Sequence, residues 1–247
     1  MSKLKLAFFD FASCEGCQIE FTNYGDEAIL QLLEHVEIVE FREAMTETTT
    51  GRIDVAFVEG SFTREADRAR LQDIRARART VVAYGACACT GGINALKNHQ
   101  DDFAEYVYGA DARMPHLRSG TARPISAAIK VDYEVRGCPM SKDELVLVLS
   151  NLIHGTEHWV PAYPVCVECK HRETICRYDE GDHCMGQVAR AGCGAPCPAD
   201  GVPCEACRGF VDDANLNALE KVLMDRGGLS QRRAVGKSRM FTANPRS

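Results

Sequence analysis

The sequence contains no long apolar run. Its longest apolar stretches cover about six to eight residues, whereas a helix that crosses a bilayer needs about twenty. The first residues, MSKLKLAFFDFASCEGC, carry lysines and a short apolar stretch. This stretch is too short for a secretory signal, and neither a small-residue cleavage site nor a twin-arginine pattern follows. We therefore expect a cytoplasmic protein with no membrane span.

Positive charge is also scarce. Lysine and arginine number 29 against 35 aspartates and glutamates, which gives a formal net charge of -6. Because nucleic-acid phosphates are bound by basic surfaces, this balance argues against nucleic acid as a partner. The hydrophobic content of 45% and the charged content of 26% are those of an ordinary soluble globular protein.

The motifs of a self-contained active site are missing as well. There is no P-loop, no G-x-G-x-x-G fingerprint, and no serine or cysteine nucleophile with a matching base. We therefore expect no catalytic residue in this chain, and its chemistry must come from a bound group.

Residues 1–157 alternate strand and helix signals. Short β-branched or aromatic runs predict strands at 4–9, 36–41, 53–58, 80–85 and 128–135. Helical patterns occur at 23–36, 64–78 and 141–155. The last of these opens with Ser141 and Glu144, at the spacing of a capping box, and ends at Gly155. Such alternation predicts an α/β, flavodoxin-like domain with a doubly wound parallel sheet covered on both faces.

From residue 158 onward the pattern changes. Two prolines in HWVPAYPVC (158–166) mark a boundary, and no convincing strand or long helix follows until 213–227. A loop segment of this length buries too little apolar surface to offset the entropy of ordering it. Metal-bound thiolates would hold it together, so we expect a second, loop-rich domain at 158–247. Its basic tail, 231–247, is expected to be loosely ordered or docked on a partner.

Thirteen cysteines are the most informative residues of the chain. Their odd number disfavours a closed disulfide framework, and disulfides are rare in the cytoplasm. Five are scattered over residues 1–140 and eight are crowded into 166–207. In chain order they are Cys14, Cys17, Cys87, Cys89, Cys138, Cys166, Cys169, Cys176, Cys184, Cys193, Cys197, Cys204 and Cys207.

Four of the scattered cysteines follow predicted strands. Cys14 and Cys17 come after the first strand, Cys87 after the fourth and Cys138 after the fifth. Because the carboxyl ends of parallel strands share one edge, where open sheets bind their ligands, we expect these four thiols to converge. Cys89 is expected to be a buried small hydrophobe instead.

The type of centre at this edge follows from its place in the fold. Glycines at 85, 91, 92 and 137 would let the backbone approach a bulky group. Four thiolates suit either tetrahedral zinc or a [4Fe–4S] cluster. A structural zinc usually ties down a small loop-rich domain, so the functional edge of a sheet favours the iron–sulfur cluster.

Three motifs resemble a known family, the small electron-transfer subunit of nickel–iron hydrogenases. They are CEGCQ at 14–18, GACACTGG at 85–92 and GCP at 137–139. The resemblance implies that one proximal [4Fe–4S] cluster lies beside the nickel–iron centre of a large partner subunit. Its ligands would be a proximal set of Cys14, Cys17, Cys87 and Cys138.

The resemblance extends to the crowded cysteines and implies two further [4Fe–4S] clusters. The distal set would be Cys166, Cys169, Cys176 and Cys184, and the medial set would be Cys193, Cys197, Cys204 and Cys207. The best-known exported members have a His where Cys166 stands and lack a counterpart of Cys197. Two additional thiolates should lower the cluster potentials.

These departures, and the missing export signal, resemble the cytoplasmic multi-subunit branch of the family. That branch includes NAD(P)-linked, sulfhydrogenase and methyl-viologen-reducing types. Its members imply an acceptor partner: a flavin and iron–sulfur subunit that serves NAD(P), or ferredoxin.

Two alternatives stay open at this point. One is the related single-cluster subunit of complex-I-like enzymes, which lacks the eight-cysteine extension. The other is a non-redox zinc scaffold, because paired C-x-x-C units are a common zinc signal.

The remaining candidates have ordinary explanations. His171 and His183 lie near the cysteines but are expected to be surface or hydrogen-bonding residues. Glu15 and Glu20 are expected to be solvated, and the arginines of 64–79 to form a solvated helix face rather than a docking site.

Overall fold

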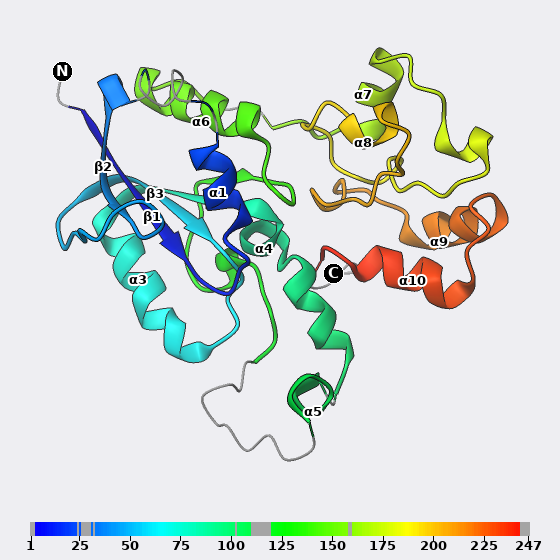
Figure 1. Ribbon diagram of the computed structural model, residues 1–247, viewed down its shortest axis with the longest axis horizontal. Helices are drawn as coiled ribbons and strands as arrows, with labels where there is room; N and C mark the ends of the chain where they lie inside the picture. The colour runs from blue at the N-terminus through cyan, green and yellow to red at the C-terminus, as the bar shows by residue number, and fades with distance from the viewer. Residues whose placement is uncertain are drawn as a thin grey trace.

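The computed structural model describes residues 3–23, 25, 31, 33–101, 103–109, 120–157 and 160–242 (Figure 1). Its strands are β1 (Leu4–Asp10), β2 (Val36–Phe41), β3 (Ile53–Glu59), β4 (Ala78–Tyr84) and β5 (Tyr133–Val135). Its first helices are α1 (Gly16–Thr22), η1 (Glu65–Asp67), α3 (Arg68–Arg77), α4 (Gly85–Thr90), η2 (Ile93–His99), α5 (Phe103–Tyr108), η4 (Ile125–Ala127) and α6 (Lys142–His154). The later helices are α7 (Val165–His171), η5 (Arg177–Glu180), α8 (Pro196–Ala199), α9 (Leu216–Asp225) and α10 (Gln231–Arg239). Half of the helix predicted at 23–36 (residues 24, 26–30 and 32) falls outside the described residues.

The five strands form one parallel sheet in the order β2-β1-β3-β4-β5. Alternate residues of each central strand face opposite hydrophobic clusters, so both faces are buried, as parallel sheets require. One cluster joins Phe8 and Phe57 to Leu145 of α6, and the other joins Phe9 and Val58 to Leu71 of α3. The predicted α/β, doubly wound fold is confirmed, and its strand order is the flavodoxin-like one.

The fifth strand is shorter than predicted. Of residues 128–135, only Tyr133–Val135 pair with β4. Just before them, the Asp132 carboxylate accepts the backbone N–H of Val81 at 2.9 Å and a hydrogen bond from Arg75 at 2.5 Å. The Asp132 side chain thus replaces a backbone carbonyl as the acceptor for Val81, and the β4–β5 pairing begins only after it.

Helix α6 begins and ends where the sequence predicts. The Ser141 side chain accepts a hydrogen bond from the backbone N–H of Glu144 at 3.3 Å, which satisfies one of the free N–H groups of the first turn. At the other end Gly155 takes a left-handed conformation with φ +68°, the usual glycine stop.

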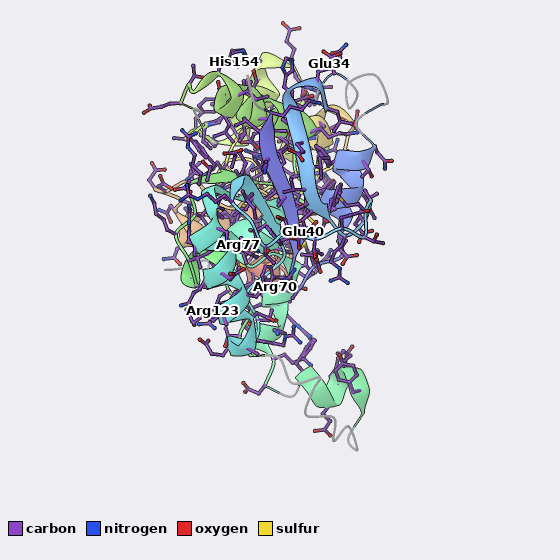
Figure 2. All side chains as sticks on the ribbon, turned by 90° about the vertical axis from the view of Figure 1, so that its left-hand side faces the viewer. Glu34, Glu40, Arg70, Arg77, Arg123 and His154 are labelled. Carbon is purple, nitrogen blue, oxygen red and sulfur yellow. The ribbon has the colours of Figure 1, made fainter. Side chains whose placement is uncertain are left out.

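The arginines of α3 and its flank have partners within the chain. Arg64 pairs with Asp67, Arg77 with Asp73, and Arg70 lies over the ring of Phe11. Figure 2 labels Arg70 and Arg77 on this side of the molecule. These contacts are those of a solvated helix face.

The C-terminal region has a hydrophobic cluster of its own, built from α7, α9, α10 and the loops between them. In Figure 1 these helices lie to one side of the sheet. The tail differs from the expectation of loose order: α10 buries Ala234 in this cluster, and Thr90 of α4 donates a 2.6 Å hydrogen bond to the carbonyl of Phe241. No helix within the described ranges is long and apolar enough to cross a membrane.

Candidate metal centres

The carboxyl edge of the sheet brings the proximal set together. Cys14 lies in the loop after β1 and Cys17 in the first turn of α1, while Cys87 lies in α4 after β4 and Cys138 follows β5. Burial, with the neighbouring Cys138 and Cys14 thiols, raises the pKa of Cys87 to about 12. Burial also raises the pKa of Cys17, and Cys138 and Cys87 add to this. The four thiols predicted to converge therefore lie within electrostatic range of one another.

Two glycines make this convergence possible. Gly85 has φ +82°, and a Cβ there would lie 2.5 Å from the sulfur of Cys17. Gly92 has φ +59°, and a Cβ there would lie 2.8 Å from the sulfur of Cys87. A side chain at either position would displace a thiol, so both positions require glycine.

A buried carboxylate beneath the proximal set was not predicted. Glu59 ends β3, is 2% exposed, and accepts the backbone N–H groups of Cys17 at 3.3 Å and Gln18 at 3.1 Å. Burial raises the pKa of Glu59 to about 7 although these two hydrogen bonds oppose the shift. The available signal was the acid that ends the largely apolar strand IDVAFVE.

A second unpredicted group is the amide of Asn94 in η2. It donates to the carbonyl of Ala12 at 2.6 Å and to the hydroxyl of Ser61 at 2.8 Å, and it lies 3.9 Å from the sulfur of Cys87. Asn94 thus joins the β1 and β3 loops beside one thiol of the proximal set. No motif in the sequence marks it.

The distal set surrounds a small cavity. Cys166 and Cys169 lie on α7, Cys176 precedes η5, and Cys184 lies in the following loop. All four line one cavity of about 40 Å³. Burial, with the Cys184, Cys169 and Cys176 thiols, raises the pKa of Cys166 to about 11. Gly186 sits between two of these sulfurs, 3.4 Å and 3.5 Å from the position of a Cβ.

The medial set lies between the distal and proximal sets. Cys193, Cys197 and Cys207 line a cavity of about 640 Å³ together with Cys138 of the proximal set. Burial raises the pKa of Cys207 to about 11, against a hydrogen bond from the backbone N–H of Cys138. Burial also raises the pKa of Cys204, and the thiols of Cys207 and Cys193 contribute.

One contact joins the medial and distal sets. The backbone N–H of Cys204 lies 3.4 Å from the sulfur of Cys184, to which it donates. The three sets therefore follow one another through direct contacts, from Cys138 to Cys207 and from Cys204 to Cys184.

The chemistry of the three sets is that of soft-metal ligands, because four cysteine thiolates suit either an iron–sulfur cluster or zinc. Burial raises the pKa of several of these thiols, so a metal that binds them must displace their protons. Over the described ranges, no group of three or more His, Cys, Asp or Glu side chains is arranged to hold a metal ion.

The comparisons with known proteins give the family. Residues 14–152 match the family model described as NADH ubiquinone oxidoreductase, 20 Kd subunit, which is more than half of the chain. The chain belongs to this family.

Members of the family that resemble the chain closely are hydrogenase subunits. Sulfhydrogenase 2 subunit delta of Pyrococcus furiosus is 33% identical over 223 residues, which cover 90% of this chain and 93% of that protein. A subunit of the F420-non-reducing hydrogenase vhu of Methanocaldococcus jannaschii is 32% identical, with 87% and 86% covered. A chain in the crystal structure of an NAD+-reducing [NiFe]-hydrogenase in the H2-reduced state is 29% identical, with a TM-score of 0.57. The predicted relationship to nickel–iron hydrogenase small subunits is confirmed.

The matches differ in how much of this chain they cover. The family model ends at residue 152, before the eight crowded cysteines. The NAD+-reducing chain is covered over 96% of its own length but covers only 64% of this one. The sulfhydrogenase and F420-non-reducing relatives span both halves.

The thirteenth cysteine lies apart from the three sets. Cys89 is 6% exposed and packs in the cluster beneath α4, where its thiol approaches the carbonyls of Ala83 at 3.4 Å and Val135 at 3.7 Å. This is the environment of a buried small hydrophobe, as predicted.

The two histidines have the environments expected for them. The His183 ring contacts Asp182 at 2.9 Å and Glu205 at 3.1 Å, and His171 is exposed. The two glutamates are less solvated than expected: Glu20 is half-buried and forms an ion pair with Lys142 at 3.0 Å, and Glu15 is half-buried with φ +60°.

Proposed function

We propose that this family member transfers electrons through three [4Fe–4S] clusters between the nickel–iron site of a large subunit and an acceptor module. The observation that carries the proposal is the arrangement of twelve thiols in three sets that contact one another in series. An electron path requires such a series, whereas a scaffold does not.

The proximal, medial and distal sets would each hold one cluster through four cysteines. When bound, the clusters would supply one-electron redox chemistry. The chain itself provides the thiolates, buries Cys17, Cys184 and Cys204 away from water, and donates backbone N–H groups to sulfur, as at Cys184 and Cys207. Such hydrogen bonds tune the potentials of iron–sulfur centres.

The exposed cysteines suggest where the large subunit docks. Cys14 and Cys138 of the proximal set are exposed in the isolated chain, as is Cys197 of the medial set, so a large subunit on this side would cover them. The distal set lies at the other end of the series and would face the acceptor module, which serves NAD(P) through a flavin subunit, or ferredoxin.

The division of labour would follow the two regions. Residues 1–157 would form the flavodoxin-like domain with the proximal cluster, and residues 158–247 the cysteine-rich domain with the medial and distal clusters. In support, two hydrophobic clusters draw only on the first region and the third only on the second. We place the whole assembly in the cytoplasm.

Metal analysis after strictly anaerobic purification tests the cluster count. About twelve irons per chain, four for each four-cysteine cluster, with little zinc are expected. About two zincs and no iron would make the C-terminal region a structural zinc module, and four irons would leave the proximal centre alone.

Cysteine substitutions test the electron path. Cys14→Ser or Cys138→Ser should abolish H2-dependent acceptor reduction while the large subunit keeps its nickel. Cys89→Ser, a thiol outside the three sets, is the matched control and should keep its iron and its activity. Undiminished acceptor reduction in either ligand variant would refute the assignment.

A further inference from the structure

Arg208 is the largest fully buried side chain among the described residues, with 1% of its surface exposed. It follows Cys207 of the medial set directly. Its guanidinium donates to both carboxylate oxygens of Glu144 in α6, at 2.7 Å and 3.0 Å. Burying a cation is costly unless it is paired and hydrogen-bonded, and this one makes four hydrogen bonds, two of them to a carboxylate.

The other partners of Arg208 belong to the loops that carry cysteines. It donates to the carbonyl of Ala191 at 2.9 Å, two residues before Cys193. It also donates to the carbonyl of Arg136 at 2.6 Å, two residues before Cys138. One guanidinium therefore holds the medial loop, the proximal loop and α6 together.

The surrounding backbone is shaped around this side chain. Gly192 has φ +114°, and a Cβ at that position would overlap the guanidinium of Arg208. In return, the Arg136 side chain donates to the carbonyl of Arg208 at 3.3 Å. These contacts hold the guanidinium of Arg208 in one position.

The cation lies close to the medial thiols. Burial raises the pKa of Cys193, and Arg208 opposes that shift, whereas Glu168, 3.9 Å from the thiol, adds to it. The carboxylate of Glu168 accepts the N–H groups of Gly192 at 2.7 Å and Gly194 at 3.0 Å. The medial set therefore has one fixed cation and one fixed anion beside it.

We propose that Arg208 is a positioning residue, held in place by Glu144, that keeps a positive charge against the medial centre and raises its reduction potential. The proposal rests on the proposed function, because it needs a cluster in the medial set. A fourth thiolate adds negative charge to that centre, and Arg208 offsets it, which brings its potential closer to that of a neighbour with which it must exchange electrons.

Three variants separate the charge from the packing. Glu144→Gln keeps the shape of the pair but leaves the cation unbalanced, so the medial centre should become easier to reduce. Arg208→Met combined with Glu144→Leu removes both charges, a replacement that buried ion pairs often tolerate. This double variant should make the medial centre harder to reduce. Arg208→Lys keeps the charge and should stay close to the wild type.

The measurement is an EPR-monitored redox titration of the intact hydrogenase complex, with iron content determined on the same samples. The medial signal is assigned by its loss in Cys193→Ser. We expect shifts of opposite sign for Glu144→Gln and the double variant, each about tenfold in the electron-exchange equilibrium, or ~59 mV for one electron.

Two results would overturn the proposal, and they are distinguishable. Unchanged medial potentials in both variants, with full iron content, would reduce Arg208 to a packing residue. No medial signal in the wild type, with no iron lost from the complex in Cys193→Ser, would refute the proposed function itself. If Glu144→Gln does not fold, because it leaves a buried charge unpaired, the sign of the shift in the double variant decides.

Discussion

Residues 3–157 and residues 160–242 are stabilised in different ways. The first region has a sheet covered on both faces, with an aromatic cluster in which Phe8 lies 4.6 Å from Phe41 and 5.0 Å from Phe57 between ring centroids. The second has only short helices, and its hydrophobic cluster includes Cys184 and Cys204. We therefore predict that the sheet region folds on apolar burial alone, whereas the cysteine-rich region needs a bound group.

Polar contacts join the two regions, among them the hydrogen bonds between Arg208 and Arg136. Arg208 pairs with Glu144, and the chain from Phe241 to Thr242 lies against α4. The first contact is ionic, and the second consists of hydrogen bonds to the backbone. These contacts therefore orient the two regions relative to each other, while the hydrophobic clusters of each region are formed from its own residues.

Removal of the metal should have the largest effect and should fall on one region only. After anaerobic iron chelation, we expect amide protons between residues 165 and 207 to exchange freely, because the thiolates lose the cations that gather them. Structural metal sites contribute on the order of ten kcal/mol to the folding of small domains. Amides of β1, β3 and β4 should stay protected. Hydrogen exchange followed by mass spectrometry measures both, and equal loss in the two regions would contradict the contrast.

A core substitution should give the reverse pattern. Phe57→Ala removes a fully buried ring at the centre of the sheet cluster and should destabilise that region by about 3–5 kcal/mol. The exposed Val202→Ala in the other region is the control, expected within about 0.5 kcal/mol. Chemical denaturation followed by circular dichroism gives both values. A loss below about 1 kcal/mol for Phe57→Ala would mean that the sheet cluster is not the source of stability.

The fit of the sheet edge around the proximal set can be tested at a single glycine. Gly85→Ala would place a Cβ against the sulfur of Cys17, so iron bound by the proximal set should fall while the other two sets keep theirs. Gly155→Ala is the matched control, because its φ of +68° gives similar backbone strain and no atom lies within 4 Å of the new Cβ. Both should lose about 1–2 kcal/mol through strain. Iron content that drops equally in the two variants would show that strain, not contact with the thiol, controls the site.

Local sequence signals predicted more of this molecule than long-range contacts did. The strand runs, the edge shared by Cys14, Cys87 and Cys138, and the start of α6 at Ser141 each follow from periodicity, strand order or a cap. The resemblance supplied the grouping of the crowded cysteines, which spacing alone leaves open. These features depend on residues close together in the chain or on rules that hold for every parallel sheet.

The features that sequence reasoning missed share a different cause. Glu144 looks like half of a capping box, yet its carboxylate pairs with Arg208, 64 residues further on. Glu59 reads as a solvated strand end, yet it is buried under the N-terminus of α1. A charged side chain is exposed by default, and only the assembled fold shows which partner justifies its burial.

The smallest expected effect concerns the cap at Ser141, and it separates the two roles of the first turn of α6. Ser141→Ala removes the acceptor for the N–H of Glu144 and should cost about 1 kcal/mol in the sheet region. Ser150→Ala, an exposed position later in the same helix, should be neutral or slightly stabilising because alanine is the better helix former. The cap uses the backbone N–H of Glu144, whereas the ion pair with Arg208 uses its carboxylate. The cap variant should therefore leave the potential of the medial centre unchanged. A shift in that potential on Ser141→Ala would mean that the start of the helix, and not the ion pair alone, sets the position of Arg208.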